Sequence, residues 1–405
     1  MSDLEWDGNE FENEEEKRVL FAALDSFFQY STIAKYNTTH LRRQSFYALP
    51  RAHLELLSSP PFSYLDTLNA VDDAIDKNAE LASAILYTGL HSFGLSARPN
   101  SKEGKEKDPN DWRGTATSND MEKARSTLRQ FYRDWSEEGA AERDVCYGPV
   151  IQVLKDERAR RPSKTPRLKV LVPGAGLGRL VFDLSSEGFD TEGNEISYHQ
   201  LLASSYILNH CPKVSEHVIY PWIHSFSNLR NRENHLQPFK VPDVHPGTFL
   251  AGDIRGEYAP GEMSMSASDF LLLYGDENHN SMFDAIATVF FLDTAPNIIR
   301  YFEVIAHCLK PGGLLVNFGP LLWHFENNAP GTHGKGLSSA PDPHNSGIAE
   351  PGSIELTDDE VVTLVEKLGF DIEQRRSGIS APYIQNPESM MQNTYKASLW
   401  VARKR

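Results

Sequence analysis

The spacing of apolar residues divides the chain into a helical first part and an alternating second part. Apolar positions recur at helical intervals across residues 17–48 and again across roughly 63–92. The segment SNDMEKARSTLRQFYRDWS continues as an amphipathic helix with Ser118 or Asn119 as its N-cap, and a further helix is expected within residues 147–158. The first part of the chain is therefore predicted to be a helical N-terminal region.

The pattern changes at Arg167. Strand-like runs such as KVLVPG and FDTEGNE alternate with helical runs, and the alternation returns in FDAIATVFFLDT, a helix over residues 297–309, and GGLLVNFG. This order predicts an α/β fold with a mostly parallel sheet and helices on both faces. The last two strand candidates, LGFDIEQRRSG and YKASLWVARK, leave no room for a crossover helix, so we expect an antiparallel pair at one edge.

Composition and charge add the domain organisation. Residues 1–16 hold eight acidic and no basic residues and are expected to form a disordered tail. Residues 17–160 form the helical region, with a polar linker at 96–114, and residues 161–405 form the sheet domain. The stretch 329–351 is rich in Gly, Pro, Ser and His and is expected to be an inserted loop.

Charge, cysteine content and the lengths of apolar runs together argue against several classes of protein. Of the formal charge of −16, half lies in the first sixteen residues, and no basic patch suggests nucleic-acid binding. The three cysteines are isolated and form neither a disulfide framework nor a CxxC pair, so no metal site is expected and a reducing compartment fits. No secretory signal or membrane-length apolar run is present. The cytosol is the expected location, with the nucleus left open.

The first candidate site lies in LKVLVPGAGLGRLVFDLSSEGFDTEGNE. Gly174, Gly176 and Gly178 follow an apolar strand and precede a helix, and Glu195 follows Gly174 by 21 positions. Such a turn lets a ligand approach the backbone, and an acid at the end of the second strand suits the hydroxyls of a ribose. The spacing is GxGxG rather than the GxGxxG of dinucleotide sites, and no GK[ST] motif follows. The pattern favours an adenosine-containing cofactor without phosphate, S-adenosylmethionine.

Further residues follow from the same interpretation of the strands. LAGDI is taken as the third strand, whose end places Asp253 and Ile254 beside an adenine ring. In the fourth strand, Val289 would face the cofactor and Asp293 would stand at the carboxyl end, where ligands of such sheets bind. A helix N-cap is the structural alternative for Asp293.

Several segments together resemble the carnosine N-methyltransferase family, from about Met121 to Lys404. They are RDWSEEGAAERDVCYGP, VPGAGLGRL, GNE, YPWIHSFSN, FFLDTAPN and LKPGGLLVNFGPLLWHFEN. The resemblance implies a Rossmann-like class I methyltransferase sheet, S-adenosylmethionine as methyl donor, and an imidazole nitrogen of carnosine or a related histidine dipeptide as acceptor. From the resemblance alone, a homodimer is plausible.

The resemblance also implies roles for individual residues. Gln130 and Arg133 would reach the cofactor, with Arg133 pairing with the methionine carboxylate. Gly174, Gly176, Glu195, Asp253, Ile254 and Val289 would complete the cofactor site, and Asp293, His324 and Tyr395 would hold the acceptor. Without the resemblance, His324 would read as a core histidine, Tyr395 as a strand tyrosine, and Gln130 and Arg133 as a polar helix face. His224 is left as structural or pocket-lining.

Two departures concern the acceptor. Asn393 and Thr394 stand where the family tends to show tyrosines, and the 329–351 loop adjoins the substrate motif. A protein histidine methyltransferase and a non-catalytic cofactor-binding scaffold are the alternatives, and the glycine spacing and terminal strand pair disfavour a dehydrogenase. A scaffold would need only the glycine loop and Glu195, so the presence of Asp293, His324 and Tyr395 favours an enzyme.

Overall fold

The computed structural model describes residues 14–98, 108–162, 166–252, 258–328, 347–349 and 352–405. The chain divides into two compact units, which we call the helical unit and the sheet unit. The helical unit comprises Met1–Ala140, Tyr198–Gly247 and Ile384–Gln392; the sheet unit comprises Ala141–Ser197, Thr248–Tyr383 and Asn393–Arg405. This division differs from the expected boundary at residue 160, because helix α6 (Ala140–Arg160) packs Tyr147, Val150 and Leu154 into a core with the sheet.

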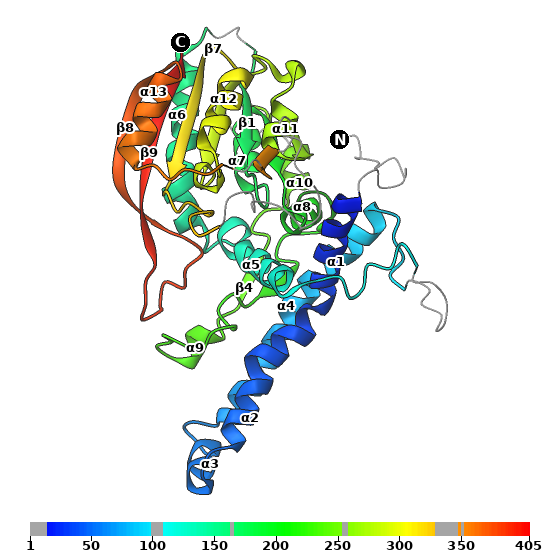
Figure 1. Cartoon of the computed structure of the whole chain (residues 1–405). Helices are drawn as coiled ribbons and strands as arrows, with labels where there is room; N and C mark the ends of the chain where they lie inside the picture. The colour runs from blue at the N-terminus through cyan, green and yellow to red at the C-terminus, as the bar shows by residue number, and fades with distance from the viewer. Residues whose placement is uncertain (1–13, 99–107, 163–165, 253–257, 329–346, 350–351) are drawn as a thin grey trace. The chain divides into compact units, whose positions relative to one another are not determined.

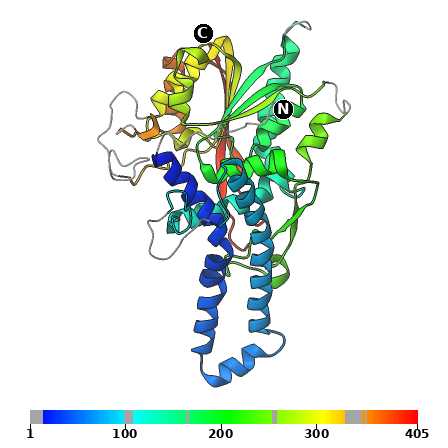
Figure 2. The same ribbon diagram turned by 90° about the vertical axis from the view of Figure 1, so that its right-hand side faces the viewer.

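The helical unit is built on two long helical segments that lie side by side (Figures 1 and 2). The first runs through α1 (Glu14–Lys35), a π-helical turn η1 (Tyr36–His40) and α2 (Leu41–Tyr47). After the short α3 (Arg51–Ser58), α4 (Tyr64–Ser92) returns along it. The predicted helix over 17–48 thus begins earlier, at Glu14, within the expected acidic tail, and contains a π-helical turn; residues 1–13 of that tail lie outside the described residues.

Gly89 of α4 allows three helices of the helical unit to approach one another closely. A Cβ atom at this position would lie 2.7 Å from Leu202 Cδ2 of α8 (Tyr198–Ser205) and 2.9 Å from Leu24 Cδ2 of α1. These separations are far below van der Waals contact, so a larger residue would displace the two leucine side chains or the helices that carry them. Gly89 therefore joins the first segment of the helical unit to its second.

The remaining elements of the helical unit are short except for α5 (Ser118–Trp135). Its N-cap is Thr117 and not the expected Ser118 or Asn119, and Thr117 and Asp120 form a reciprocal capping box. The others are η2 (Tyr206–His210), β3 (His217–Ile219), α9 (Arg232–His235) and β4 (Phe239–Val241), of which β3 and β4 pair antiparallel. Within the expected linker 96–114, Trp112 is buried and its indole N–H donates to the Ser96 carbonyl at 3.0 Å, so this part of the linker is packed.

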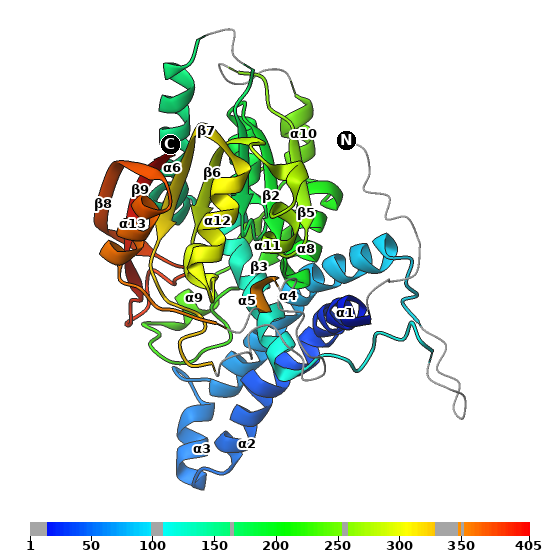
Figure 3. The same cartoon turned by 45° about the horizontal axis from the view of Figure 1, so that its top comes forward.

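The sheet unit contains a seven-stranded sheet with the order β5-β2-β1-β6-β7-β9-β8 (Figure 3). Its strands are β1 (Lys169–Pro173), β2 (Asp190–Glu195), β5 (Met263–Ala267), β6 (Phe283–Val289), β7 (Leu309–Gly319), β8 (Phe370–Pro382) and β9 (Thr394–Lys404). The five strands from β5 to β7 are parallel, and β9 runs antiparallel to both β7 and β8. The predicted mostly parallel sheet with an antiparallel pair at one edge is confirmed; the antiparallel strand is β9, whereas the edge strand β8 runs parallel to the other five.

Helices cover both faces of this sheet. The helices α6 and α7 (Arg179–Ser186) pack on the face that carries Val170 and Val172 of β1. The other face, which carries Leu171, is covered by α11 (Phe270–Tyr274), α12 (Ile298–Cys308) and α13 (Asp358–Lys367). Successive residues of a strand point to opposite faces, so the apolar run in β1 is buried on both sides.

The predicted third strand is wrong. Leu250 and Ala251 of LAGDI belong to helix α10 (Pro246–Ala251), and Asp253 and Ile254 lie outside the described residues. The strand that pairs with β2 at this edge is β5, whose sequence MSMSA alternates Met with Ser. Because β5 contains few apolar residues, its sequence does not show the strand pattern that its neighbours show. Of the expected insertion at 329–351, the described part is a 3-10 turn, η5 (Gly347–Ala349). Within the described part of the chain, no helix has the length and apolar character needed to cross a membrane.

Candidate active site

The glycine loop joins β1 to α7 and has a left-handed backbone at all three glycines. Gly174, Gly176 and Gly178 have φ angles of 68°, 56° and 74°, which favour glycine strongly. At Gly174 a Cβ atom would lie 2.7 Å from Cδ2 of Phe291, a buried ring just beyond β6. The loop therefore presents bare backbone at the carboxyl end of β1, where ligands of parallel sheets bind.

Glu195, at the end of β2, holds this loop in place. Its Oε2 atom accepts a hydrogen bond from the Gly176 N–H at 2.9 Å, and Oε1 accepts from the N–H groups of Ile196 and Ser197, both at 2.9 Å. Burial raises the pKa of the Glu195 carboxyl, and the three backbone N–H groups oppose that rise. Since a carboxylate oxygen accepts up to two hydrogen bonds, Oε2 can accept one more from a ligand hydroxyl. The structure thus brings together Gly174, Gly176 and Glu195.

The other residues predicted to bind the cofactor lie in three different parts of the chain. Val289 is the last residue of β6, the strand next to β1, and is partly exposed. Asp253 and Ile254 lie outside the described residues, so their roles stay predictions. Gln130 and Arg133 belong to α5 of the helical unit, and their role toward the cofactor also stays a prediction.

Gln130 and Arg133 are part of a buried polar network. The Arg133 guanidinium pairs with both carboxylate oxygens of Asp134, at 2.7 and 3.1 Å. The Gln130 side-chain amide donates to Asp134 Oδ2 at 3.0 Å, and Gln200 donates to Gln130 Oε1 at 2.9 Å. Asp134 is therefore a partner of Arg133 that the sequence did not suggest. The network fixes the direction of both glutamine amides, because a carboxylate only accepts.

The structure brings together the predicted acceptor residues Asp293 and His324. Asp293 lies in the 3-10 turn η4 (Leu292–Thr294) beyond β6 and is 3% exposed. Its Oδ2 atom accepts from the Leu322 N–H at 2.9 Å, and its carbonyl oxygen accepts from the His324 N–H at 3.1 Å. The N-cap of α12 is Asn297, so the structural alternative for Asp293 is excluded.

Asp293 and His324 differ in their exposure to solvent, and this affects the pKa of the Asp293 carboxyl. Burial raises the pKa of Asp293, whereas the Leu322 N–H and the nearby His324 oppose the rise. The His324 side chain itself is exposed, so the core-histidine alternative does not hold. An ionised Asp293 can accept a hydrogen bond from a ring N–H and can stabilise a positive charge that forms next to it.

Tyr395 belongs to an aromatic cluster at the same place. Its ring centroid lies 6.1 Å from that of Phe290 and 6.2 Å from that of Tyr383, and Phe290 and Tyr383 are 4.9 Å apart. Burial raises the pKa of the half-buried Tyr395, with further contributions from Tyr383 and Asp293. Phe290 has a φ of 53°, which is rare for an aromatic residue and typical of functional turns.

Sequence reasoning missed Phe290 and Tyr383. Phe290 carried a signal, because it stands between two predicted site residues, Val289 and Asp293, at the end of a strand. Tyr383 carried none, since it follows β8 and meets Phe290 only through the antiparallel strand pair.

His224 has a structural role in the helical unit. Its Nε2 atom lies 2.9 Å from the Tyr30 hydroxyl, which also accepts from the Asn78 amide at 3.1 Å. Burial, followed by nearby arginines, lowers the pKa of His224 to about 3, so it is neutral at physiological pH. The neutral His224 ring is hydrogen-bonded to Tyr30 and packs edge-on against it, which fits a structural role.

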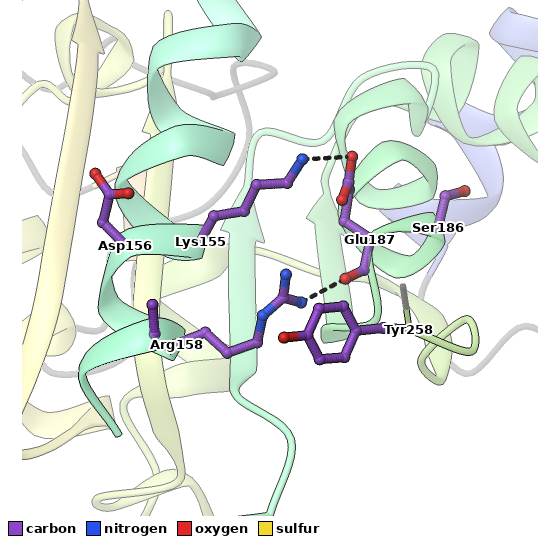
Figure 4. A pocket seen from close by; sticks show the side chains of 7 residues that line it. Lys155, Asp156, Arg158, Ser186, Glu187 and Tyr258 are labelled. Carbon is purple, nitrogen blue, oxygen red and sulfur yellow. Dashed lines mark hydrogen bonds and ion pairs between the residues drawn. The ribbon is translucent and has the colours of Figure 1, made fainter. Parts of the chain in front are cut away.

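A separate pocket of about 370 Å³ lies between the end of α6 and the end of α7 (Figure 4). Lys155 pairs with Glu187 at 2.7 Å, and Arg158 donates to the Glu187 carbonyl and stacks over the Tyr258 ring at 3.8 Å. The glycine loop precedes α7, whereas this pocket adjoins its far end, before β2 begins. The charged groups pair with one another, so we assign the pocket no ligand.

The fold and the site define a class of protein. The strand order with an antiparallel strand next to the edge, and a glycine loop closed by a strand-end carboxylate, are those of a class I methyltransferase. At the carboxyl end of β6, the turn that carries Asp293 is hydrogen-bonded to the segment that carries His324, and the role of both residues as an acceptor site stays a prediction.

Comparison with known proteins gives the family. Residues 110–405 match the family model described as carnosine N-methyltransferase. The chain is 36% identical over 394 residues to the carnosine N-methyltransferase of Mus musculus, covering 96% of this chain and 86% of that protein. It is 34% identical over 392 residues to that of Schizosaccharomyces pombe, covering 96% and 97%. The chain belongs to the carnosine N-methyltransferase family.

Among solved structures, a SAM-dependent methyltransferase from Methanosarcina mazei aligns with a TM-score of 0.34 at 16% identity. The alignment covers 59% of this chain and 93% of that one. A likeness at this level has no bearing on the assignment, which follows from the family match.

Proposed function

We propose that this protein transfers a methyl group from S-adenosylmethionine to an imidazole nitrogen of carnosine, giving anserine, or of a related histidine dipeptide. The observation that carries the proposal is the grouping of Asp293, exposed His324 and the aromatic cluster at the carboxyl end of β6. This grouping occurs in a chain whose curated relatives are named carnosine N-methyltransferases.

The residues present fit the proposed donor. Gly174, Gly176 and Gly178 present backbone without side chains at the carboxyl end of β1, and Glu195 Oε2 can accept one hydroxyl of a ribose. S-adenosylmethionine supplies a methyl group on a positive sulfur, which is already activated for displacement. The protein therefore needs chiefly to position the nucleophile and exclude water.

The acceptor residues suit a neutral imidazole that becomes positive. A free imidazole has a pKa near 6.5, so an unprotonated ring is available at physiological pH. In our proposal, Asp293 accepts the N–H of the ring nitrogen that does not react, which turns the other nitrogen toward the methyl group. Asp293 then stabilises the methylated cation, and the faces of Phe290, Tyr383 and Tyr395 add cation–π attraction. His324, being exposed, contacts the remainder of the dipeptide.

The test is isothermal titration with S-adenosylmethionine and then carnosine, with mass spectrometry of the product. We expect cofactor binding and a carnosine product one methyl group heavier. Cofactor binding with no methylated carnosine would contradict the acceptor and direct the assay to histidine peptides. Absence of cofactor binding would overturn the whole proposal.

A variant tests the role of Asp293. Asp293→Asn keeps the size of the side chain but loses the charge, and we expect kcat to fall roughly 100-fold while cofactor affinity is unchanged. The matched control is Asp371→Asn, the same change at an exposed position on β8 that pairs with Arg405. Full activity of Asp293→Asn would remove Asp293 from the mechanism.

A further inference from the structure

Trp323 has an unusual backbone conformation beside the acceptor residues. It lies between Leu322 and His324, and its φ is 49°. A left-handed backbone is unfavourable for a residue with a Cβ atom, and for a bulky residue it persists only where the surroundings enforce it. The question is what holds Trp323 in this conformation and what that conformation does.

The Trp323 side chain is held by a hydrogen bond and by apolar packing. The indole Nε1–H donates to the Leu356 carbonyl at 3.0 Å. The ring packs, together with Leu356, against the apolar cluster beneath α12 and α13. The indole is thus tied by one hydrogen bond and by core packing to the segment that precedes α13.

The same segment is also tied to the turn that carries Asp293. The Ile354 N–H donates to the Pro296 carbonyl at 3.0 Å, and Pro296 lies three residues after Asp293. Residues 354–356 therefore contact both sides of the site. On one side they hold Pro296, and on the other they hold the indole of Trp323.

The left-handed conformation decides where the neighbours of Trp323 point. The Leu322 N–H bonds the Asp293 carboxylate, and the His324 N–H bonds the Asp293 carbonyl. These two donors flank Trp323, so a change in its φ cannot keep both bonds. Loss of the Leu322 bond would free the Asp293 carboxylate to rotate, and loss of the His324 bond would move the imidazole.

We propose that Trp323 is a positioning residue, whose indole bond to Leu356 maintains the hydrogen bonds that Leu322 and His324 make to Asp293. Its significance for catalysis rests on the proposed function, whereas its effect on the turn does not. Trp323 touches neither substrate nor cofactor in this proposal; it acts through the two residues that it flanks.

The experiment compares two variants of Trp323 with a control in the full-length protein. Trp323→Phe removes the N–H and shortens the ring, and replacement of Trp323 by 3-benzothienylalanine removes the N–H alone. The control is Trp400→Phe, the same truncation in β9, where the ring packs on the same apolar cluster. Trp400 is buried, so this control reports general loosening of that core.

The first measurement is hydrogen exchange of the peptide spanning residues 320–326, which needs no activity. Loss of one hydrogen bond predicts an increase in exchange of about fivefold to tenfold in both Trp323 variants, and no increase in Trp400→Phe. Unchanged exchange in the benzothienyl variant, or the same increase in Trp400→Phe, would overturn the proposal whether or not carnosine is the substrate.

The second measurement separates positioning from stability. We expect KM for carnosine to rise about tenfold and the ratio of the two ring-methylated isomers to shift, while the dissociation constant for S-adenosylmethionine stays the same. A fall in Tm with an unchanged isomer ratio and KM would show a purely structural Trp323. If the unaltered protein does not methylate carnosine, the proposed function fails and the exchange measurement still decides the role of Trp323 in the turn.

Discussion

Gly174→Ala is the substitution whose cost the structure defines most completely. The backbone φ of 68° is a left-handed conformation, which costs alanine about 1–2 kcal/mol. The added Cβ atom would also lie 2.7 Å from Phe291 Cδ2. Phe291 is buried, stacked on Tyr301 at 4.9 Å and edge-on to Phe270 at 5.5 Å, so movement of its ring would disturb both neighbours. Overpacking of this kind costs about 1–3 kcal/mol.

The two terms together predict a loss of about 2–5 kcal/mol in the free energy of unfolding. Gly312→Ala is the matched control, because Gly312 has a φ of 75° but no atom lies within 4 Å of its added Cβ. We expect this control to lose about 1–2 kcal/mol, the conformational term alone. Guanidinium unfolding measures both variants, and the difference between them isolates the contact with Phe291.

Cofactor affinity gives the functional half of the test. We expect Gly174→Ala to weaken S-adenosylmethionine binding at least about tenfold, because the loop must shift to relieve the contact; Gly312→Ala should bind normally. A second substitution, Phe291→Leu, should restore part of the stability of Gly174→Ala. Equal losses of stability in the two alanine variants, with unchanged cofactor affinity, would refute the argument.

Two further predictions follow from the titratable groups. Glu195→Gln turns one acceptor oxygen into a donor that faces backbone N–H groups, so cofactor affinity should fall about tenfold or more by titration calorimetry; unchanged affinity would contradict the role of Glu195. In the helical unit, burial lowers the pKa of His199 to about 4, of His224 to about 3 and of His235 to about 4. The unfolded chain binds protons at these residues near pH 6.5 and the folded chain does not, so their stabilisation is complete above that pH and is lost as the pH falls toward 3–4. Urea unfolding between pH 7 and 5 should show this fall, and His235→Gln should make it shallower; an equal slope in that variant would count against the histidines.

The central part of the fold was predictable because sequence pattern and local structure agree there. The run from β1 through the glycine loop to β2 has a strand buried on both faces, glycines where the backbone is left-handed, and an acid at the strand end. Each of these features depends on residues close together in the chain, so each can be recognised in a short stretch of sequence. The same holds for β6 and α12, which follow one another in the chain.

What could not be predicted depends on contacts between distant segments. The edge strand β5 has too few apolar residues to be distinguished from a loop, and its identity is fixed only by pairing with β2. Tyr383 joins the aromatic cluster because two strands pair antiparallel, and Asp134 pairs with Arg133 for reasons of burial. The short NTTH segment, in which α-helical periodicity gives way to a π turn, likewise carries no recognisable signal.

The division of the chain into units has a consequence for how the protein is assembled and dissected. The helical unit is made of three stretches of sequence, and the sheet unit of three others. Gly89 receives Leu24 from its own stretch and Leu202 from the next, which is synthesised after β1 and β2 of the other unit. No single cut therefore releases an intact unit, and a fragment beginning at Ala141 would carry α8 without its packing partners. During synthesis, the first helices must wait for more than a hundred further residues before their core can close. Because the segments of the two units alternate along the chain, we expect a nick within one unit to lower the stability of the other as well.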